Sequence, residues 1–210
     1  MYDHDIHHRQ SHRWRKHDYS SPGFYYVTIC IQDYRCLLGN VSAGMMNLND
    51  AGRMVDAAWS EIPTRFPTMR LDEHMAMPNH FHGITEITVR QNIGDRGAPL
   101  VGLLKIAPEP ATAGAGTRPA PTLGDAVGAF KSVSTDEYIK GVNELGWPRF
   151  RGRFWERNYY DHVIHDQYEL EKIRQYIRQN PLMWSCDRYN PENSVLVLDE
   201  TGHVVPWDES

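Results

Sequence analysis

The stretch Met77–Ile84, MPNHFHGI, decides how the rest of the chain is interpreted. It places His80 and His82 two residues apart, with Phe81 between them. Successive side chains of a β-strand point to opposite faces, so both imidazoles project to one side while Phe81 turns into a core. Two neutral imidazoles on one strand make half of a metal site that needs one or two further donors. The alternative is a pair of polar core histidines that bind no metal.

The missing donors are found about a hundred residues later, in YELEKIRQYIRQNP at 168–181. This pattern predicts a helix that ends at Asn180 and Pro181, and it places Tyr176 and Asn180 four residues apart on one helical face. One helix can therefore present a phenol and an amide oxygen to the two histidines. Such a set suits a nucleophilic phosphoryl-transfer centre. Alternatively, Tyr176 is a packing residue and Asn180 only caps the helix.

The remaining pattern alternates strands and helices. The stretch FYYVTICIQ at 24–32 alternates and is rich in β-branched and aromatic residues, which predicts a strand. A hairpin whose return is 45–48 follows, and then a helix that Asn49 caps and Pro63 stops. Further predicted elements are a strand over 71–77 with an edge or bulge at Pro78, a strand over 80–89, a helix over 125–138 and a C-terminal hairpin beyond 190. The Gly-, Ala- and Pro-rich stretch at about 90–123 is expected to be a flexible insertion.

Composition limits the class of protein. A chain of 210 residues with 40% hydrophobic and 23% charged residues suits one soluble domain with appendages. No apolar run approaches the roughly 18 residues of a membrane span, and the polar N-terminus is not a secretory signal. Cys30, Cys36 and Cys186 form no CxxC pair and leave an odd thiol. We therefore expect a cytoplasmic location and no membrane partner.

Two basic clusters bear on a nucleic-acid partner. The net charge of −5 argues against one, but binding depends on local patches, since charge is screened beyond about 10 Å. One cluster lies in the His-rich N-terminal arm at residues 1–20. The second alternates arginines with aromatic residues, a pattern that can hold phosphates and stack on unpaired bases; its candidates are Arg149, Arg151, Arg153, Trp155 and Arg157. Lys131, on the helix before it, can also face a phosphate. For each, a solvated surface is the alternative.

The segments MPNHFHGI, RFWERNYYDHVI and YIRQNP, in this order after an early FYYVTICIQ strand, resemble the single-tyrosine HUH transposases, and most closely the REP-associated tyrosine transposases. The resemblance covers about residues 20–190. It implies an α+β domain with a ferredoxin-like antiparallel sheet and helices packed on one face. It also implies cleavage and rejoining of single-stranded, hairpin-forming DNA through a 5′-phosphotyrosine, in a cytoplasmic protein associated with the nucleoid.

Carried over residue by residue, the resemblance makes Tyr176 the nucleophile and His80, His82 and Asn180 the metal ligands. Two imidazoles with oxygen ligands favour Mg²⁺ or Mn²⁺ over a structural zinc. The expected organisation is an arm at 1–20, the transposase domain at 21–190 and a hairpin tail at 191–210. A homodimer that exchanges the Tyr176 helix is left open. So are three rival functions: a non-catalytic DNA-binding module, a regulatory descendant of a transposase, and a hydrolase whose histidines activate water.

Overall fold

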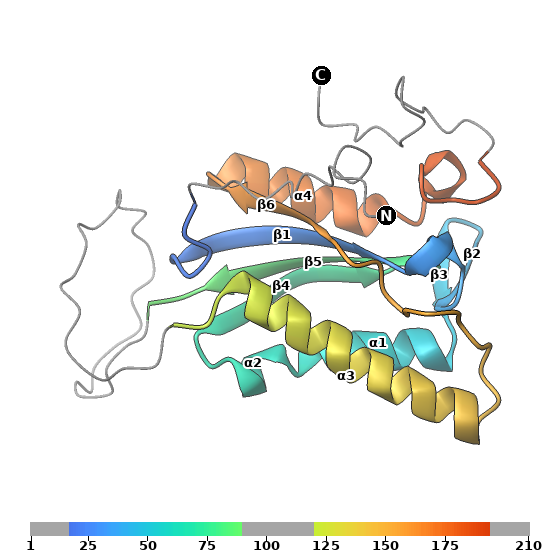
Figure 1. The fold of residues 1–210 in the computed structure, drawn as a ribbon. Coiled ribbons are helices and arrows are strands. Elements are labelled where there is room, and N and C mark those ends of the chain that lie inside the picture. The colour runs from blue at the N-terminus through green and yellow to red at the C-terminus, as the bar shows by residue number, and fades with distance from the viewer. Residues whose placement is uncertain (1–16, 90–119, 194–210) are drawn as a thin grey trace, which may run out of the picture.

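A computed structural model of the chain describes residues 17–89 and 120–193 (Figure 1). Its strands are β1 (Gly23–Cys30), β2 (Gly39–Ser42), β3 (Met45–Leu48), β4 (Met69–Ala76), β5 (His80–Ile87) and β6 (Tyr160–Ile164). Its α-helices are α1 (Asp50–Ser60), α2 (Ile62–Arg65), α3 (Leu123–Glu144) and α4 (Gln167–Gln179). Short 3-10 helices occupy Gln32–Tyr34 and Trp184–Cys186.

The main sheet has the ferredoxin-like arrangement. Its strands lie in the order β4-β5-β1-β6, and each neighbouring pair is antiparallel. Leaving aside the β2–β3 hairpin and the short α2, the chain runs β1-α1-β4-β5-α3-β6, which is the β-α-β-β-α-β unit of that fold. The predicted α+β class and antiparallel sheet are therefore confirmed. Strand β5, which carries both histidines, is central and pairs with β1 on one side and β4 on the other.

One face of the sheet is covered by α1 and α3, as Figure 1 shows below the strands. Val27, Ile29 and Phe81 point to this side and are fully buried. The rings of Trp59 and Phe130 pack on Phe81 with centroid distances of 4.9 and 5.0 Å. This large apolar core fixes the strand that carries the histidines, because Phe81 lies between them and points the other way.

Helix α4 lies on the opposite face, above the strands in Figure 1. The helices were expected on one face, which holds for α1 and α3 of the ferredoxin-like unit but not for α4, which follows β6. A smaller cluster of buried side chains lies beneath α4, including Tyr26, Ile84 and Ile177. Two ion pairs tie α4 to β4: Arg174 to Asp72 at 2.6 Å, and Arg178 to Glu73 at 2.9 Å.

Several boundaries differ from the sequence predictions. Helix α1 ends at Ser60, and Pro63 lies in the first turn of α2, where its missing N–H leaves no helical hydrogen bond unmade. Pro78 lies between β4 and β5, and the irregular register of β4 falls between Leu71 and His74 instead. Helix α3 is longer than expected at both ends: the capping box of Thr122 and Asp125 starts it at Leu123, and it continues beyond residue 138 to Glu144.

The end of the expected N-terminal arm is packed against the domain. His17 Nε2 lies 3.1 Å from the Tyr25 hydroxyl, and the Tyr19 carbonyl accepts a hydrogen bond from the Leu123 backbone N–H. The rest of the arm, nearly all of the insertion and most of the C-terminal hairpin lie outside the described residues. Within 17–89 and 120–193, none of the helices is both long and apolar enough to span a membrane.

Candidate active site

The two histidines form a buried pair at the end of β5 nearest α4. His80 and His82 are 0% and 1% exposed, and their Nε2 atoms lie 2.9 Å apart. Their rings meet edge to face with centroids 4.5 Å apart. Burial lowers the pKa of His80 well below its usual value and that of His82 to about 3, so both imidazoles are neutral over the physiological pH range. The prediction that both project to one side is confirmed.

Asn79 fixes the proton on His80. The Asn79 amide nitrogen donates to the backbone carbonyls of Tyr34 and Tyr189, at 2.9 and 2.6 Å, which orients its Oδ1 towards His80 Nδ1 at 2.9 Å. An amide oxygen only accepts, so His80 Nδ1 carries the hydrogen and Nε2 keeps its lone pair. This is the tautomer that a metal-binding histidine uses, with its outer nitrogen held by a neighbouring acceptor.

His82 is held by two hydroxyls from β1. The Tyr26 hydroxyl lies 2.8 Å and the Thr28 hydroxyl 3.0 Å from His82 Nδ1, and Thr28 also donates to the Tyr26 oxygen at 2.9 Å. Either oxygen can accept a hydrogen from Nδ1 and so leave Nε2 with its lone pair. Tyr26 and Thr28 share a parity on β1, and Thr28 is directly opposite His82 in the register, which explains why these side chains meet.

Helix α4 brings the tyrosine and the asparagine to this pair. The helix starts at the Asp166 cap and ends at Asn180. The Tyr176 ring lies 5.4 Å from the ring of His82 and 6.5 Å from that of Tyr26. The polar side chains of Asn180 and Tyr26 both lower the pKa of the Tyr176 hydroxyl. Tyr176, Asn180, His80 and His82 are therefore gathered at one place.

The Tyr176 hydroxyl is protonated near neutral pH. Burial raises the pKa of Tyr176 to about 12, and the nearby Asp187 carboxylate adds to this effect. The polar side chains of Asn180 and Tyr26 and the positive charge of Arg188 lower the pKa and so oppose this shift. Any reaction in which this oxygen attacks must therefore remove its proton during the step.

The donors suit a divalent cation. The two imidazole Nε2 atoms lie 2.9 Å apart, close enough for one cation to bind both. Asn180 is 2% exposed, and its Oδ1 has no hydrogen-bond partner among the described residues. An orphaned buried oxygen costs about 1–3 kcal/mol, which a bound cation would offset. The described ranges contain no cluster of three or more His, Cys, Asp and Glu side chains that could bind a metal.

The turn after α4 supplies functional groups that the sequence did not indicate. The Asp187 carboxylate lies 3.9 Å from His80 Nε2, and burial raises its pKa. Arg188 donates to the Tyr189 hydroxyl at 2.7 Å, and its charge acts on His80, His82 and Tyr176. This segment has no regular pattern, so nothing in the sequence placed it here. The roles of Tyr26, Thr28 and Asn79 could have been inferred from strand parity and from adjacency to His80.

A sequence relative decides the family. The chain is 37% identical over 190 residues to a Haemophilus influenzae protein described as an uncharacterized protein, covering 89% of this chain and 96% of that one. The two chains belong to one protein family. No protein-family profile matches the sequence.

One solved structure shares the fold of this chain. The structure of a REP-associated tyrosine transposase bound to a REP hairpin matches with a TM-score of 0.50 and 14% identity, over 80% of this chain and 71% of that one. A putative transposase from Deinococcus radiodurans matches with a TM-score of 0.43 and 15% identity, over 79% of this chain and 95% of that one. At such low identity the first similarity shows a shared fold, the fold of a tyrosine transposase.

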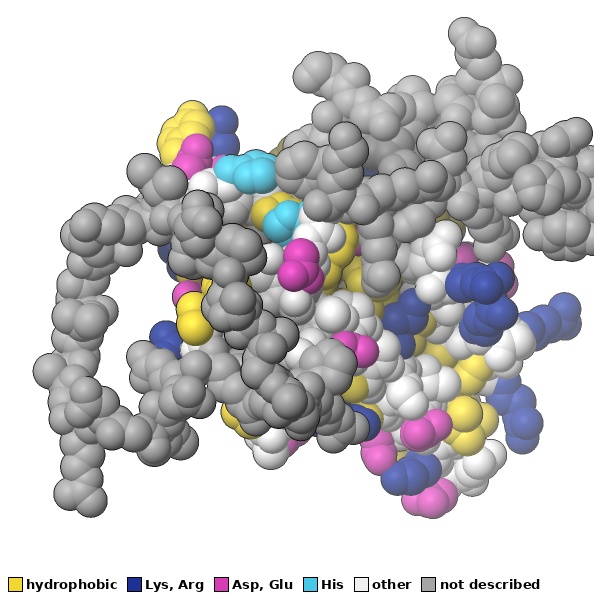
Figure 2. Space-filling model, turned by 60° about the vertical axis from the view of Figure 1, so that its left-hand side comes forward, with side chains coloured by type: hydrophobic (Ala, Val, Ile, Leu, Met, Phe, Trp, Pro, Cys, Tyr) yellow, Lys and Arg dark blue, Asp and Glu magenta, His cyan; other side chains and the backbone are white. Residues whose placement is uncertain are grey.

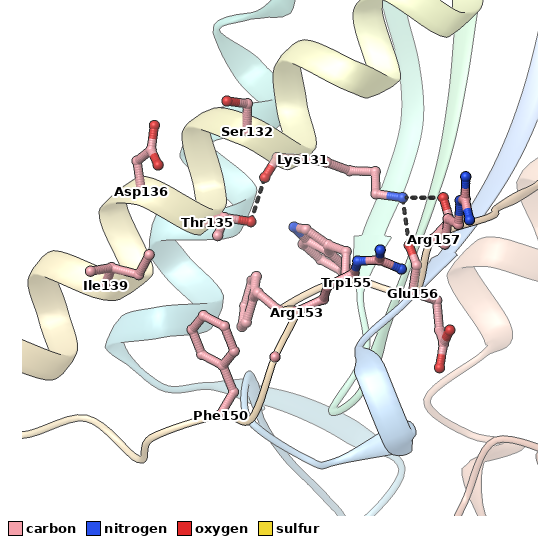
Figure 3. Close-up of a pocket in the computed structure, with 12 residues that line it drawn as sticks. Lys131, Ser132, Thr135, Asp136, Ile139, Phe150, Arg153, Trp155, Glu156 and Arg157 are labelled. Atoms are coloured by element: carbon pink, nitrogen blue, oxygen red, sulfur yellow. Dashed lines mark hydrogen bonds between the residues drawn. The ribbon is translucent and has the colours of Figure 1, made fainter.

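Four of the expected DNA-binding residues lie apart from the histidines, between α3 and the segment 150–157: Lys131, Arg153, Trp155 and Arg157 (Figure 3). Lys131, Arg153 and Arg157 line a pocket of about 500 Å³ there, which shares no residue with the cavity beside Tyr176. Arg149, Arg151, Arg153 and Arg157 are all exposed. The Lys131 ammonium instead points back to the chain, donating to the carbonyls of Glu156 and Arg157 at 2.6 and 3.1 Å, and burial lowers its pKa to about 8.

Trp155 is a core residue. It is 3% exposed, its ring packs on Phe130 and Phe154, and its indole N–H donates to Ser134 at 2.9 Å. Stacking on a base requires an exposed ring face. We therefore correct the sequence expectation by leaving Trp155 out of the DNA-contacting set. Phe150 is partly exposed at the same pocket.

Basic side chains are unevenly distributed over the surface. In Figure 2 most of the visible lysine and arginine side chains lie on the right-hand side of the molecule. The overall charge of −5 therefore does not describe each face. A local basic surface is what phosphate contacts require.

Proposed function

We propose that this chain cleaves and rejoins single-stranded DNA through a covalent 5′-phosphotyrosine on Tyr176. The observation that carries the proposal is the packing of Tyr176 and Asn180, both from α4, beside two buried imidazoles whose Nε2 atoms lie 2.9 Å apart. The shared fold with a REP-associated tyrosine transposase supports it, and the REP hairpin bound to that protein favours hairpin-forming DNA as the substrate here. This makes the chain a transposase of the single-tyrosine HUH type.

His80, His82 and Asn180 would hold the metal. Nitrogen donors with an amide oxygen, open to further oxygen ligands, favour Mg²⁺ or Mn²⁺. When bound, the cation supplies positive charge that polarises the scissile phosphate. Asn79 and the β1 hydroxyls keep both imidazoles oriented before the ion binds.

Tyr176 is the nucleophile in the proposed reaction. Its oxygen forms a bond to phosphorus while the bond from phosphorus to the 3′-oxygen breaks. The phenol loses its proton, and the departing 3′-oxygen gains one, so the step is balanced. The new ester keeps the energy of the phosphodiester, which lets a second 3′-hydroxyl reverse the reaction without ATP. Packing of the Tyr176 ring against the rings of His82 and Tyr26 holds the phenol in place for the attack.

Arg188 compensates the negative charge of the reaction. Its charge already lowers the pKa of Tyr176, so it stabilises a phenolate as the proton leaves. It also lines the cavity that adjoins Tyr176, where it can contact a phosphate oxygen. The exposed Arg149, Arg151, Arg153 and Arg157 would bind the DNA backbone further away. Lys131 acts indirectly, by holding the carbonyls of Glu156 and Arg157.

The test is a denaturing gel. Purified protein is incubated with labelled single-stranded hairpin DNA from beside its own gene, in Mn²⁺ or in EDTA. We expect a protein–DNA band that survives denaturation, requires the metal and is absent in Tyr176→Phe. Tyr168→Phe is the matched control, because Tyr168 lies on the same helix but is 71% exposed, and it should retain the band.

Two other outcomes would assign a different function. The burial that raises the pKa of Tyr176 to about 12 also suits a tyrosine that only packs, which is the observation favouring a non-catalytic or regulatory DNA-binding module. DNA binding with no covalent band in any metal would support that module. Metal-dependent cleavage that leaves a free 5′-phosphate and persists in Tyr176→Phe would instead indicate a hydrolase.

A further inference from the structure

Helix α4 covers only part of its face of the sheet. It packs over β4 and β5 and is tied to β4 by the pairs Arg174–Asp72 and Arg178–Glu73. On the same face, Tyr26 of β1 and Tyr160 of β6 pack against side chains of α4. A cavity of about 610 Å³ lies there, with Tyr176 in its wall. Binding sites for small organic groups commonly measure roughly 300–1,000 Å³, so the cavity has room for one nucleoside.

The floor and walls of the cavity suit a base. Tyr26 and Tyr160 come from the neighbouring strands β1 and β6, and their rings meet at 6.1 Å. Ile173 of α4 faces the same space one turn before Tyr176. The partly exposed ring of Tyr160 can stack on an unpaired base, and Ile173 together with the buried Tyr26 excludes water from it. The nucleophile and the base-binding surface thus share one cavity.

The polar groups of the cavity lie at its rim. His162 and Glu169 are paired at 2.7 Å, and the second oxygen of Glu169 accepts the His165 backbone N–H at 2.7 Å. This gives the carboxylate a fixed orientation, which is what reading the edge of a base requires. Lys172 and Arg188 add two positive charges to the same lining. An apolar interior with cations at the rim matches a base with phosphates on either side.

We propose that this cavity binds the base of a nucleotide that adjoins the phosphate attacked by Tyr176, with Lys172 and Arg188 on the flanking phosphates. The inference rests on the proposed function for the identity of that phosphate. It adds a base-selective subsite formed by β1, β6 and α4, separate from the arginines at 149–157. The chain then recognises the base of one nucleotide next to the cleaved phosphate.

The test is an abasic scan measured by binding. The full-length wild-type chain is titrated, in EDTA so that no cleavage occurs, against labelled oligonucleotides in which each nucleotide in turn lacks its base. We expect one position at which loss of the base weakens binding about tenfold, as removal of a stacked base does. A scan in which no single position matters overturns the subsite.

Filling the cavity should abolish this difference. In Ile173→Trp the intact oligonucleotide should bind as weakly as the abasic one does to wild type, and the abasic one should be unaffected. Met45→Trp is the control, because Met45 of β3 is 64% exposed and lines neither this cavity nor the pocket beside α3. Tyr160→Leu tests the same prediction by removing the floor ring. A position-specific effect that survives both cavity variants would place the base elsewhere and overturn the proposal.

The two proposals fail in different ways. If wild type forms the covalent band but the abasic scan is flat, the chemistry is right and the subsite is wrong. If the scan gives one sensitive position that Ile173→Trp removes, but no covalent band forms, the subsite exists in a DNA-binding module. The sensitive position should adjoin the cleaved phosphate when both experiments succeed, and a sensitive position several nucleotides away contradicts the subsite.

Discussion

The two faces of the sheet differ in the kind of side chain that is buried on them. On the side of α1 and α3, the rings of Trp59, Phe81 and Phe130 pack without contact with solvent. On the side of α4, His80, His82 and the hydroxyl of Thr28 are buried, the Asp187 side chain is 7% exposed, and the amide oxygen of Asn180 lacks a partner within the described chain. A polar arrangement of this kind is costly to bury. We infer that burial of apolar side chains on the first face offsets the free-energy cost of burying polar groups on the second.

Truncating Trp59 should lower the stability of the fold more than any other change considered below. Trp59→Ala removes a fully buried indole that meets Phe81 and Phe130, and it should lower the free energy of unfolding by about 3–5 kcal/mol. Urea denaturation measures the change. Leu145→Ala, at a side chain that is 67% exposed, should stay within about 0.5 kcal/mol of wild type. A loss at Trp59 no larger than that at Leu145 would contradict the assignment of stability to this face.

Metal binding should stabilise the other face. Mn²⁺ at a hundredfold excess over its dissociation constant should raise the free energy of unfolding by about 2.7 kcal/mol, because it binds only the folded chain. Thermal unfolding with Mn²⁺ and with EDTA measures the gain. His82→Ala should abolish it, while His165→Ala, at an exposed histidine, should preserve it. An equal gain in His82→Ala would show that the ion binds elsewhere.

The attachment of α4 should depend on charge. Hydrogen bonds from Arg174 lower the pKa of Asp72, and the pair is about four-fifths buried, at 19–22% side-chain exposure. Asp72→Asn should cost about 1–2 kcal/mol of unfolding free energy and slow formation of the covalent band. Glu73→Gln, which breaks the more exposed pair with Arg178, should cost less. The difference from wild type should shrink in high salt, and an effect insensitive to salt would point to packing instead.

The smallest expected change in unfolding free energy comes from the pair His74–Asp56, which joins β4 to α1. A hydrogen bond to Asp56, at 3.2 Å, raises the pKa of His74, although burial opposes the shift. The pair therefore stabilises the fold fully below the unfolded histidine pKa of about 6.5, and this contribution is lost as pH rises through the higher folded pKa. Urea unfolding of wild type and Asp56→Asn should differ by less than about 1 kcal/mol, and only at low pH. A difference that grows towards alkaline pH would contradict this sign.

The two faces were also unequally predictable from sequence. Strand alternation placed His80 and His82 on one side of β5 and Phe81 on the other, and helical spacing placed Tyr176 and Asn180 together, because both follow from local geometry. The burial of Trp155 could not be read this way. Its segment alternates arginine with aromatic residues, and only packing against α3 turns Phe154 and Trp155 inward. Arg188 was missed for a similar reason, since a turn without periodicity gives no direction to its side chain.

The candidate site is divided between two elements: β5 supplies both imidazoles, and α4 supplies both Tyr176 and Asn180. An experiment that mixes two variant chains can use this division. One variant chain carries His80→Ala and His82→Ala and keeps an intact α4. It is mixed with a second variant that carries Tyr176→Phe and Asn180→Ala and keeps the intact histidines of β5. If each α4 stays on its own sheet, the mixture remains inactive. Recovered activity requires helix α4 to cross to a partner chain, so complementation in the mixture reports the exchanged homodimer directly.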